Sequence, residues 1–309
     1  MSEATSSLLR QIRDDNRSGA SEITERAAEC LTTFVEAFEG QARRDFIAEL
    51  SGIGLEVIRA QPAMAPLFNL VNGVLLKAEG IEDLQACKAA VREQAEEFIR
   101  TLKEGRETLV TFAADLVRED STILVHSYSA TLYRTLSALH DRGKAFSVIC
   151  TESRPLQEGI TLARRLSEEG VSVRLVVDAA AFQLLQQVDL VFVGADTISP
   201  FSVTNKIGTR GLAVAAQCQE VPFYVLAGTE KCLCMDARLE PEMEIRPASE
   251  VFDGDEPIEV LNFYFDHTPL QLVSGVITER GILGTGELHE YFKTIEIHPV
   301  LMDGQARIR

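Results

Sequence analysis

The chain contains no hydrophobic run long enough to cross a lipid bilayer, which takes about 20 consecutive apolar residues in a helix. Its most apolar stretch, residues 62–76, is short and is interrupted by Asn69 and Asn72. The N-terminus, Met1-Ser2-Glu3, lacks the basic start and apolar segment of a secretory signal. On these absences we expect a cytoplasmic protein with no membrane partner.

Positive charge is also scarce. The 309 residues include 30 Lys and Arg against 47 Asp and Glu, a formal net charge of −17. A surface this acidic repels phosphate backbones, so we expect no nucleic-acid partner. A small anion can still bind where a few cations and backbone N–H groups converge. In a cytoplasmic protein the six cysteines should be reduced.

Several catalytic and metal-binding motifs are missing as well. The chain has no G-x-x-x-x-G-K-[ST] phosphate loop and no G-x-S-x-G hydrolase elbow. Its five histidines form no paired helical motif, and Cys232-x-Cys234 has no second cysteine pair at a suitable distance. We therefore predict no metal site and no bound cofactor.

The length of the chain suits one large domain or two ordinary ones. The pattern of apolar residues divides it into two parts. Up to residue 118, apolar residues recur every three or four positions, as in Leu84, Cys87, Val91, Ala95 and Phe98. This is the period of amphipathic helices. We predict a helical N-terminal domain over residues 1–118.

The second part, residues 119–309, contains short runs rich in β-branched residues that alternate with helix-like stretches. Such alternation predicts an α/β domain with a doubly wound, mostly parallel sheet, in which ligands bind at the carboxyl ends of the strands. The predicted helices cover residues 130–140, 156–168 and 205–220. The predicted strands cover residues 122–125, 146–149, 173–177, 190–193, 223–226 and 276–278.

Two segments after predicted strands carry the strongest candidate residues. Asp196, in Gly194-Ala195-Asp196, follows an apolar strand and is either a functional carboxylate or a turn and capping residue. Asn205 and Lys206 lie near the start of a predicted helix, where exposed N–H groups and a cation would form a phosphate site. The alternative for Lys206 is a solvated surface lysine.

Hydroxyl and guanidinium groups follow the first two strands. Ser127 and Ser129 can donate to a phosphate, or they can simply cap the next helix. In an extended segment they would share one face, and His126 would lie on the other, badly placed to activate Ser127. Arg154 can clamp a phosphate in bidentate fashion, or it can pair with a nearby acid such as Glu152 or Glu158.

Taken in order, these segments resemble one superfamily. It contains the alpha, beta and delta subunits of eukaryotic translation initiation factor 2B, methylthioribose-1-phosphate isomerase and ribose-1,5-bisphosphate isomerase. The resemblance implies a helical N-terminal domain, a Rossmann-like C-terminal domain, a sugar-phosphate ligand, and a homodimer or higher homo-oligomer formed largely through the C-terminal domains. It rests on residues 123–129, 148–155, 177–180, 194–196, 205–209, 265–269 and 277–281.

The resemblance also implies roles for individual residues. The isomerases use a cysteine at the end of the first C-terminal strand and the aspartate of Gly-Ala-Asp. Asp196 matches that aspartate, whereas Ser127 stands at the cysteine position. An Arg-Gly-Ala segment of the isomerases corresponds to Arg17, Gly19 and Ala20, with Ser18 inserted. Gln61 replaces another arginine, and Arg59 is the candidate to compensate.

Two functions follow from this comparison. The first is a homologue of the initiation factor 2B alpha subunit that binds a sugar phosphate or a nucleoside monophosphate without catalysis. The second is an aldose–ketose isomerase of a pentose 1-phosphate, in which Asp196 is the acid–base group and Ser127 or a water replaces the thiol. Losing the cysteine favours the first function, and retaining Asp196 favours the second.

Overall fold

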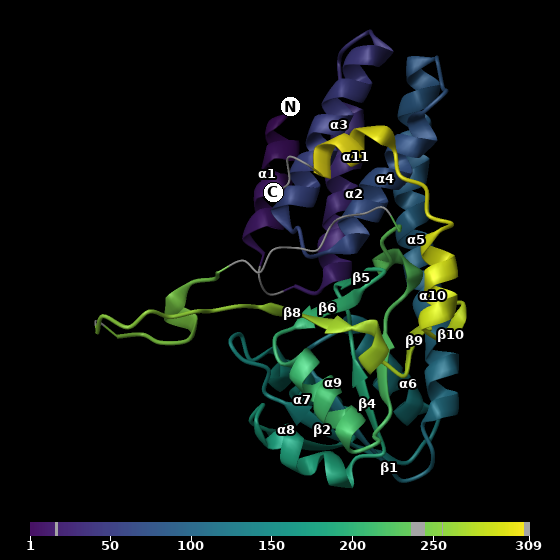
Figure 1. The fold of residues 1–309 in the computed structure, drawn as a ribbon. Helices are drawn as coiled ribbons and strands as arrows, with labels where there is room; N and C mark the ends of the chain where they lie inside the picture. The colour runs from purple at the N-terminus through teal and green to yellow at the C-terminus, as the bar shows by residue number, and fades with distance from the viewer. Residues whose placement is uncertain (16–17, 236–244, 255, 306–309) are drawn as a thin grey trace.

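The computed structural model describes residues 1–15, 18–235, 245–254 and 256–305. Helices fill the upper part of the molecule and a twisted sheet fills the lower part (Figure 1). No helix in these ranges is long and apolar enough to span a membrane. The helices of the first part are α1 (Glu3–Asp14), α2 (Ala20–Ala37), α3 (Arg43–Ala60), α4 (Ala65–Ala78) and α5 (Leu84–Leu116).

The first five helices pack around one apolar core, as their periodicity predicts. Phe34 and Phe46 stack in this core with ring centroids 5.6 Å apart. Leu301, from the C-terminal helix α11 (Pro299–Gln305), is completely buried in the same core. The 33-residue helix α5 joins the two parts, because its first half packs in the helical core and its second half packs on the sheet. The domain boundary at residue 118 remains a prediction.

Seven strands form the main sheet in the order β10-β9-β7-β4-β1-β2-β3. All neighbours are parallel except β10, which pairs antiparallel with β9. The predicted α/β class with a mostly parallel, doubly wound sheet is confirmed. The strands are β1 (Ser121–His126), β2 (Phe146–Thr151), β3 (Ser172–Val176), β4 (Leu190–Val193), β7 (Phe223–Leu226), β9 (Gly275–Thr278) and β10 (Gly281–Leu283).

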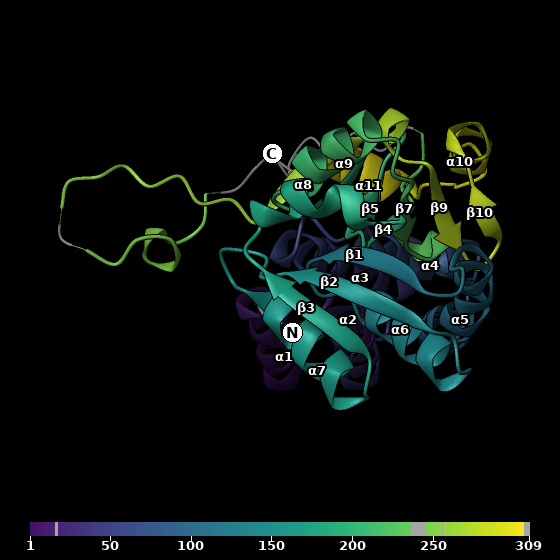
Figure 2. The ribbon, with the colours of Figure 1, turned by 90° about the horizontal axis from the view of Figure 1, so that it is seen from below.

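Helices cover both faces of this sheet, which explains why its strands read as continuous apolar runs. Along β1, Ile123 and Val125 pack on the face with α5, whereas Leu124 packs on the other face. Figure 2 shows these two layers from below. One face is covered by α5, α6 (Ala130–Asp141) and α7 (Glu158–Glu168). The other face is covered by α8 (Ala180–Leu184), α9 (Thr209–Cys218) and α10 (Thr285–Phe292).

The strand order reverses between β1 and β4, which are neighbours although they are not consecutive in the chain. His126 at the end of β1 pairs with Val193 at the end of β4. Loops leaving these two ends diverge to opposite sides, and this is where open α/β sheets bind ligands.

A small antiparallel sheet was not predicted. It consists of β5 (Thr197–Ile198), β6 (Ser202–Lys206) and β8 (Phe265–Pro269), in the order β5-β6-β8. The prediction of a helix over residues 205–220 is wrong at its start, because Asn205 and Lys206 end β6 and α9 begins at Thr209. Pairing with β8, about 60 residues later, holds this polar segment in an extended conformation.

Candidate functional site

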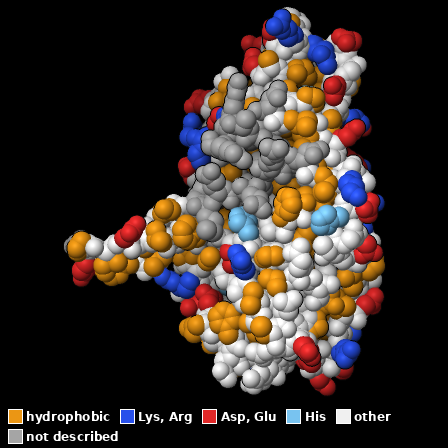
Figure 3. All heavy atoms as spheres, in the orientation of Figure 1, with side chains coloured by type: hydrophobic (Ala, Val, Ile, Leu, Met, Phe, Trp, Pro, Cys, Tyr) orange, Lys and Arg blue, Asp and Glu red, His pale blue; other side chains and the backbone are white. Residues whose placement is uncertain are grey.

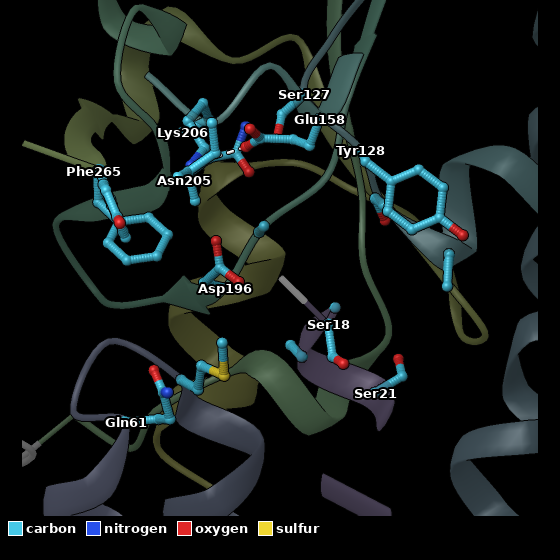
Figure 4. A pocket seen from close by; sticks show the side chains of 18 of the residues that line it. Ser18, Ser21, Gln61, Ser127, Tyr128, Glu158, Asp196, Asn205, Lys206 and Phe265 are labelled. Carbon is cyan, nitrogen blue, oxygen red and sulfur yellow. Dashed lines mark hydrogen bonds and ion pairs between the residues drawn. The ribbon is translucent and has the colours of Figure 1, made fainter. Parts of the chain in front are cut away.

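A cavity of about 440 Å³ lies between the helical part and the carboxyl ends of β1 and β4. Figure 4 shows the side chains that converge on it from both parts of the chain. Seven of the predicted residues line it: Gly19, Ala20, Ser127, Ser129, Asp196, Asn205 and Lys206. Residues that are distant in sequence therefore meet at the switch point of the sheet.

Asp196 is held in place by its backbone. Its N–H donates to the carbonyl of Thr204 at 2.9 Å, and its carbonyl accepts from the N–H of Ala65 at 3.2 Å. The hydroxyl of Thr197 accepts from the same N–H at 2.9 Å and donates to the carbonyl of Ala63 at 2.8 Å. The N-terminus of α4 thus fixes the segment that carries the carboxylate.

The electrostatic surroundings of Asp196 make its carboxylate easier to protonate than that of an exposed aspartate. Burial raises the pKa of the Asp196 carboxyl above its ordinary value, and Lys231 and Lys206 offset part of that rise. Lys231 is itself buried, and its ammonium donates to the carbonyl of Ala195. A carboxyl whose pKa is raised accepts a proton more readily than an exposed aspartate, and its protonated form can donate that proton back.

Ser127 does not adopt the extended conformation considered from the sequence. Its φ is 71°, in the left-handed region, so the alternation of faces expected for residues 126–129 does not hold. Its N–H donates to the Ser153 hydroxyl at 2.8 Å, and its own hydroxyl donates to Glu158 Oε1 at 3.1 Å. The hydroxyl therefore has a carboxylate as its acceptor, at the first residue of α7.

A chain of hydrogen bonds beneath Ser127 fixes its backbone. His126 Nε2 lies 2.9 Å from the carbonyl of Ile207, so Nε2 carries the proton and Nδ1 accepts from the Thr151 hydroxyl at 2.7 Å. The Ser153 hydroxyl then donates to Thr151 Oγ1 at 2.9 Å. Burial lowers the pKa of His126, which keeps it neutral. His126 therefore supports the loop and does not activate the Ser127 hydroxyl.

Lys206 forms a largely buried ion pair with Glu158. Its Nζ lies 2.7 Å from Glu158 Oε1, and the two side chains are 7% and 21% exposed. The ammonium also lies over the ring of Tyr264, 4.9 Å from the centroid. Glu158 Oε2 is buried without a hydrogen-bond partner among the described residues. The cavity thus contains an acceptor that a ligand hydroxyl can satisfy.

Two helix N-termini face the cavity. Ser129 caps α6 by accepting from the N–H of Leu132 at 3.4 Å, so the predicted capping role is confirmed. Gly19 begins α2 without a side-chain cap. Gly194 allows Ser129 to approach, because a Cβ built there would lie 2.7 Å from Ser129 Cβ. Free N–H groups at such termini favour anions.

Two predicted residues of the described part of the chain, Arg154 and Arg59, do not line the cavity. Arg154 instead donates to the carbonyl of Glu250 at 3.0 Å, which directs its guanidinium toward the segment that precedes β8. Arg59 forms an exposed ion pair with Glu56 on α3, one residue before that helix ends, so it does not compensate for Gln61. Gln61 itself lines the cavity. Arg17 lies outside the described residues.

The lining residues that were not predicted include Glu158, Lys231, Arg246 and Tyr264. Lys231 ends the short 3-10 helix Thr229–Lys231, just after the carboxyl end of β7, so its place in a doubly wound sheet was a usable signal. The others had none, since they come from a helix start and from a long connection before β8. In the part of the chain that the structure describes, no three His, Cys, Asp or Glu side chains are grouped as metal ligands would be.

The arrangement can bind a polyhydroxylated anion. Lys206 and the two helix N-termini supply positive potential, while Asp196 and Glu158 Oε2 supply acceptors for hydroxyl groups. Asp196 and Ser127 both line this cavity (Figure 4). A carboxyl with a raised pKa and a hydroxyl bonded to a second carboxylate form a possible acid–base pair.

Comparisons with known proteins point to one family. A model of the "Initiation factor 2 subunit family" matches residues 16–285. An eIF-2B subunit 2-like protein of Pyrococcus furiosus is 32% identical over 277 residues, which cover 89% of this chain and 95% of that protein. The ribose 1,5-bisphosphate isomerase of Methanocaldococcus jannaschii is 32% identical over 278 residues, covering 88% and 89%. The crystal structure of translation initiation factor eIF-2B from Pyrococcus horikoshii matches with a TM-score of 0.81 at 29% identity, covering 92% and 98%.

Proposed function

This chain belongs to the initiation factor 2 subunit family, and from that premise we propose that it binds a sugar phosphate or a nucleoside monophosphate as an initiation factor 2B alpha-subunit-like protein. The observation that carries the proposal is the combination of Lys206 and two helix N-termini with two carboxylates in one cavity. The cations and N–H groups suit a phosphate, and the carboxylates suit the hydroxyls of a sugar.

Each group has a definite task in this proposal. Lys206, Asn205 and the N–H groups that follow Ser129 hold the phosphate, with Gly19 and Ala20 closing the site from α2. Asp196 accepts from the sugar hydroxyls. Arg154 and Arg59 have no task here, because both lie away from the cavity.

Binding without turnover is favoured by the side chain at position 127. A serine hydroxyl is a much weaker acid than the thiol that the resemblance implies for the isomerases. Its bond partner, Glu158, is already paired with Lys206 through the same oxygen. Loss of one catalytic group of this kind commonly lowers a rate by several orders of magnitude.

The alternative function is an aldose–ketose isomerase of a pentose 1-phosphate. One observation favours it: burial raises the pKa of Asp196, which suits a group that delivers a proton and later recovers it. Ring opening and the C2-to-C1 hydrogen shift would then rely on Asp196, with the Ser127 hydroxyl or a water as the second group.

Phosphorus and proton NMR separates these functions. Purified protein is mixed with ribose 1,5-bisphosphate, methylthioribose 1-phosphate and adenosine monophosphate. Broadened or shifted ligand lines without conversion support binding, and appearance of a ketose supports the isomerase. Unchanged spectra across the panel contradict both. Asp196→Asn should lose the effect, whereas Asp115→Asn, an exposed substitution on α5, should retain it.

A second variant tests the role of position 127. If the site is intact but lacks its thiol, Ser127→Cys should gain isomerisation of at least one of these sugars while ligand affinity stays within severalfold. Ser127→Ala is the matched control and should bind without turnover. Isomerisation by the wild-type chain that Ser127→Ala leaves unchanged would assign the chemistry to Asp196 alone.

We further propose that the protein acts in the cytoplasm as a homodimer or higher homo-oligomer, with no nucleic-acid or membrane partner. The acidic net charge of −17 supports the absence of nucleic-acid binding. Sedimentation of the purified chain measures the assembly directly. A single-chain mass at all concentrations would contradict the homo-oligomer while leaving ligand binding untouched.

A further inference from the structure

The protein contains a second cavity, of about 280 Å³, which is separate from the site described above. Its walls come from α4, α5 and α10, which lie on one side of the molecule (Figure 1), and from the loops that follow β7 and β9. Lys231 lines the first cavity, whereas Thr229 and Glu230 line the second, so one short segment separates the two. Small-molecule sites commonly enclose about 300–1,000 Å³, so this cavity suits a small ligand.

Arg106 of α5 is the unusual side chain in the second cavity. On the face seen in Figure 3, Lys and Arg side chains lie at the surface and are interspersed with Asp and Glu. The Nε and Nη2 atoms of Arg106 are instead buried, and they have no hydrogen-bond partner among the described residues. Burial lowers the pKa of this guanidinium, and Glu230 offsets part of that effect without forming an ion pair with it. Because buried donors are normally paired, we expect a partner for these N–H groups in the functional protein.

An acceptor without a donor lines the same cavity. The amide nitrogen of Asn69, on α4, donates to the carbonyl of Glu230 at 2.7 Å and to the carbonyl of Cys232 at 2.8 Å. These two bonds fix the orientation of the amide. They leave its Oδ1 buried and without a hydrogen-bond partner among the described residues. The second cavity therefore combines unpaired donors on α5 with an unpaired acceptor on α4.

Two carboxylates, those of Glu230 and Glu279, complete the polar lining. Glu279 accepts from the N–H of Thr229 at 3.0 Å and from the hydroxyl of the same residue. A Cβ built at Gly228 would collide with Glu230 Oε2 and would lie 3.2 Å from Glu279 Oε2, so both carboxylates reach the space above this glycine. A Cβ built at Gly105 would lie 3.4 Å from Glu279 Cγ, which places that side chain against α5. Two carboxylates this close favour a cationic group beside them.

The charges in the second cavity select among classes of small ligand. A phosphate would be repelled by Glu230 and Glu279, and a metal cation would be repelled by Arg106. A neutral polyol would leave the guanidinium without a counter-charge. A zwitterion has one carboxylate and one ammonium and can satisfy both groups. The apolar part of the lining suits an apolar substituent on that zwitterion, and it includes Phe98, Leu102, Leu109 and Ile295.

We propose that the second cavity binds a small α-amino acid with an apolar side chain. Its carboxylate pairs with the planar fork of Arg106, which matches a carboxylate in bidentate fashion. Its ammonium donates to Asn69 Oδ1 and lies beside Glu230 and Glu279. This site goes beyond the proposed sugar-phosphate function and does not depend on it, because the two ligands occupy different cavities.

Thermal unfolding of the full chain with each of the twenty L-amino acids, followed by calorimetric titration of the best binder, tests the site. At least one of leucine, isoleucine, valine and methionine should raise the Tm and bind with one ligand per chain. Analogues that lack the ammonium or the carboxylate, which are isocaproate and isoamylamine for leucine, should bind about tenfold or more weakly. Absence of binding by all twenty would overturn the proposal. Tighter binding of inorganic phosphate, or equal binding of either analogue, would overturn the ligand class.

Variants assign the ligand to the named side chains. Arg106→Lys keeps the charge but loses the fork, so it should weaken amino-acid binding about tenfold or more, and Arg106→Met should abolish it. Arg100→Lys, at an exposed position of the same helix, is the matched control and should bind as the wild type does. Glu230→Gln should weaken binding of the amino acid but not of isocaproate, a difference that a purely structural role would not produce. Circular dichroism confirms that each variant is folded.

One further variant separates the two cavities. Asp196→Asn should lose sugar-phosphate binding and keep the wild-type affinity for the amino acid, since Asp196 lines only the first cavity. Loss of amino-acid binding in Asp196→Asn but not in Arg106→Met would place the amino acid in the first cavity and overturn the proposal. Failure of the sugar-phosphate experiment alone would leave amino-acid binding by the wild type as direct support for the second site.

Discussion

Lys206 Nζ lies 2.7 Å from Glu158 Oε1, and this ion pair is enclosed between β6, the start of α7 and the ring of Tyr264. The same carboxylate oxygen accepts from the Ser127 hydroxyl. One oxygen atom therefore connects the end of β1, the start of α7 and the end of β6. Substituting Ser127, Glu158 or Lys206 should therefore change the hydrogen bonding of the other two.

The first prediction concerns the cost of breaking this pair. Lys206→Met leaves Glu158 as a buried, uncompensated charge, so it should lower the free energy of unfolding by about 3–5 kcal/mol. The double variant Lys206→Met, Glu158→Gln should recover most of that loss, because no unpaired charge remains. Urea denaturation measures both. Lys293→Met, which removes the exposed pair with Glu290, should change stability by less than about 1 kcal/mol.

The second prediction follows from the raised pKa of Asp196. A carboxyl whose folded pKa exceeds its ordinary value of 3.8 binds protons more readily in the folded state, so its ionisation costs stability as pH rises above 3.8. Asp196→Asn should therefore raise the free energy of unfolding at neutral pH, and this gain should vanish below 3.8. The same variant should lose ligand affinity by about tenfold or more. A lower free energy of unfolding for Asp196→Asn at pH 7 would contradict the predicted increase.

The third prediction concerns the neutral, buried His126. Burial lowers its pKa below the ordinary 6.5, so the unfolded chain takes up the proton first as the pH falls. The free energy of unfolding should therefore decline below pH 6.5, and His126→Gln should show a shallower decline than the wild type. Denaturant titrations at several pH values between 5 and 8 measure the two slopes. Equal slopes for the two proteins would show that His126 does not contribute to the loss of stability at low pH.

The fourth prediction tests the close approach of α6 to β4. A Cβ at Gly194 would lie 2.7 Å from Ser129 Cβ and 3.0 Å from its Oγ. Gly194→Ala should cost about 1–3 kcal/mol and displace the cap of α6, which also weakens ligand binding. Gly52→Ala, inside α3 with no atom within 4 Å of the new Cβ, should instead be neutral or stabilising by up to about 1 kcal/mol.

The main sheet was predictable because its signal is local. Strands buried on both faces need unbroken apolar runs, and Leu190–Val193 and Phe223–Leu226 match their predicted limits. The small sheet was not predictable, because β6 has the polar sequence Ser-Val-Thr-Asn-Lys and becomes a strand only by pairing with β8. Long-range pairing of this kind leaves no periodicity in either segment.

The candidate site divides in the same way. Asp196, Ser127 and Ser129 were found from their positions after strands, which a doubly wound sheet brings to one edge. Glu158 and Tyr264 were missed because only tertiary packing brings them to Lys206. Arg154 was assigned to a phosphate from its residue type, but its guanidinium donates to the carbonyl of Glu250, in the segment that precedes β8. Position 194 likewise requires a glycine because Ser129 lies against it, and only the structure shows this contact.

The complete burial of Leu301 among the N-terminal helices has a consequence for biosynthesis. Other side chains of that core, such as Phe34 and Phe46, are translated some 250 residues before Leu301. This helical core is therefore completed only late in translation. A nascent chain stalled after the sheet would expose this gap, which is the kind of surface that chaperones hold.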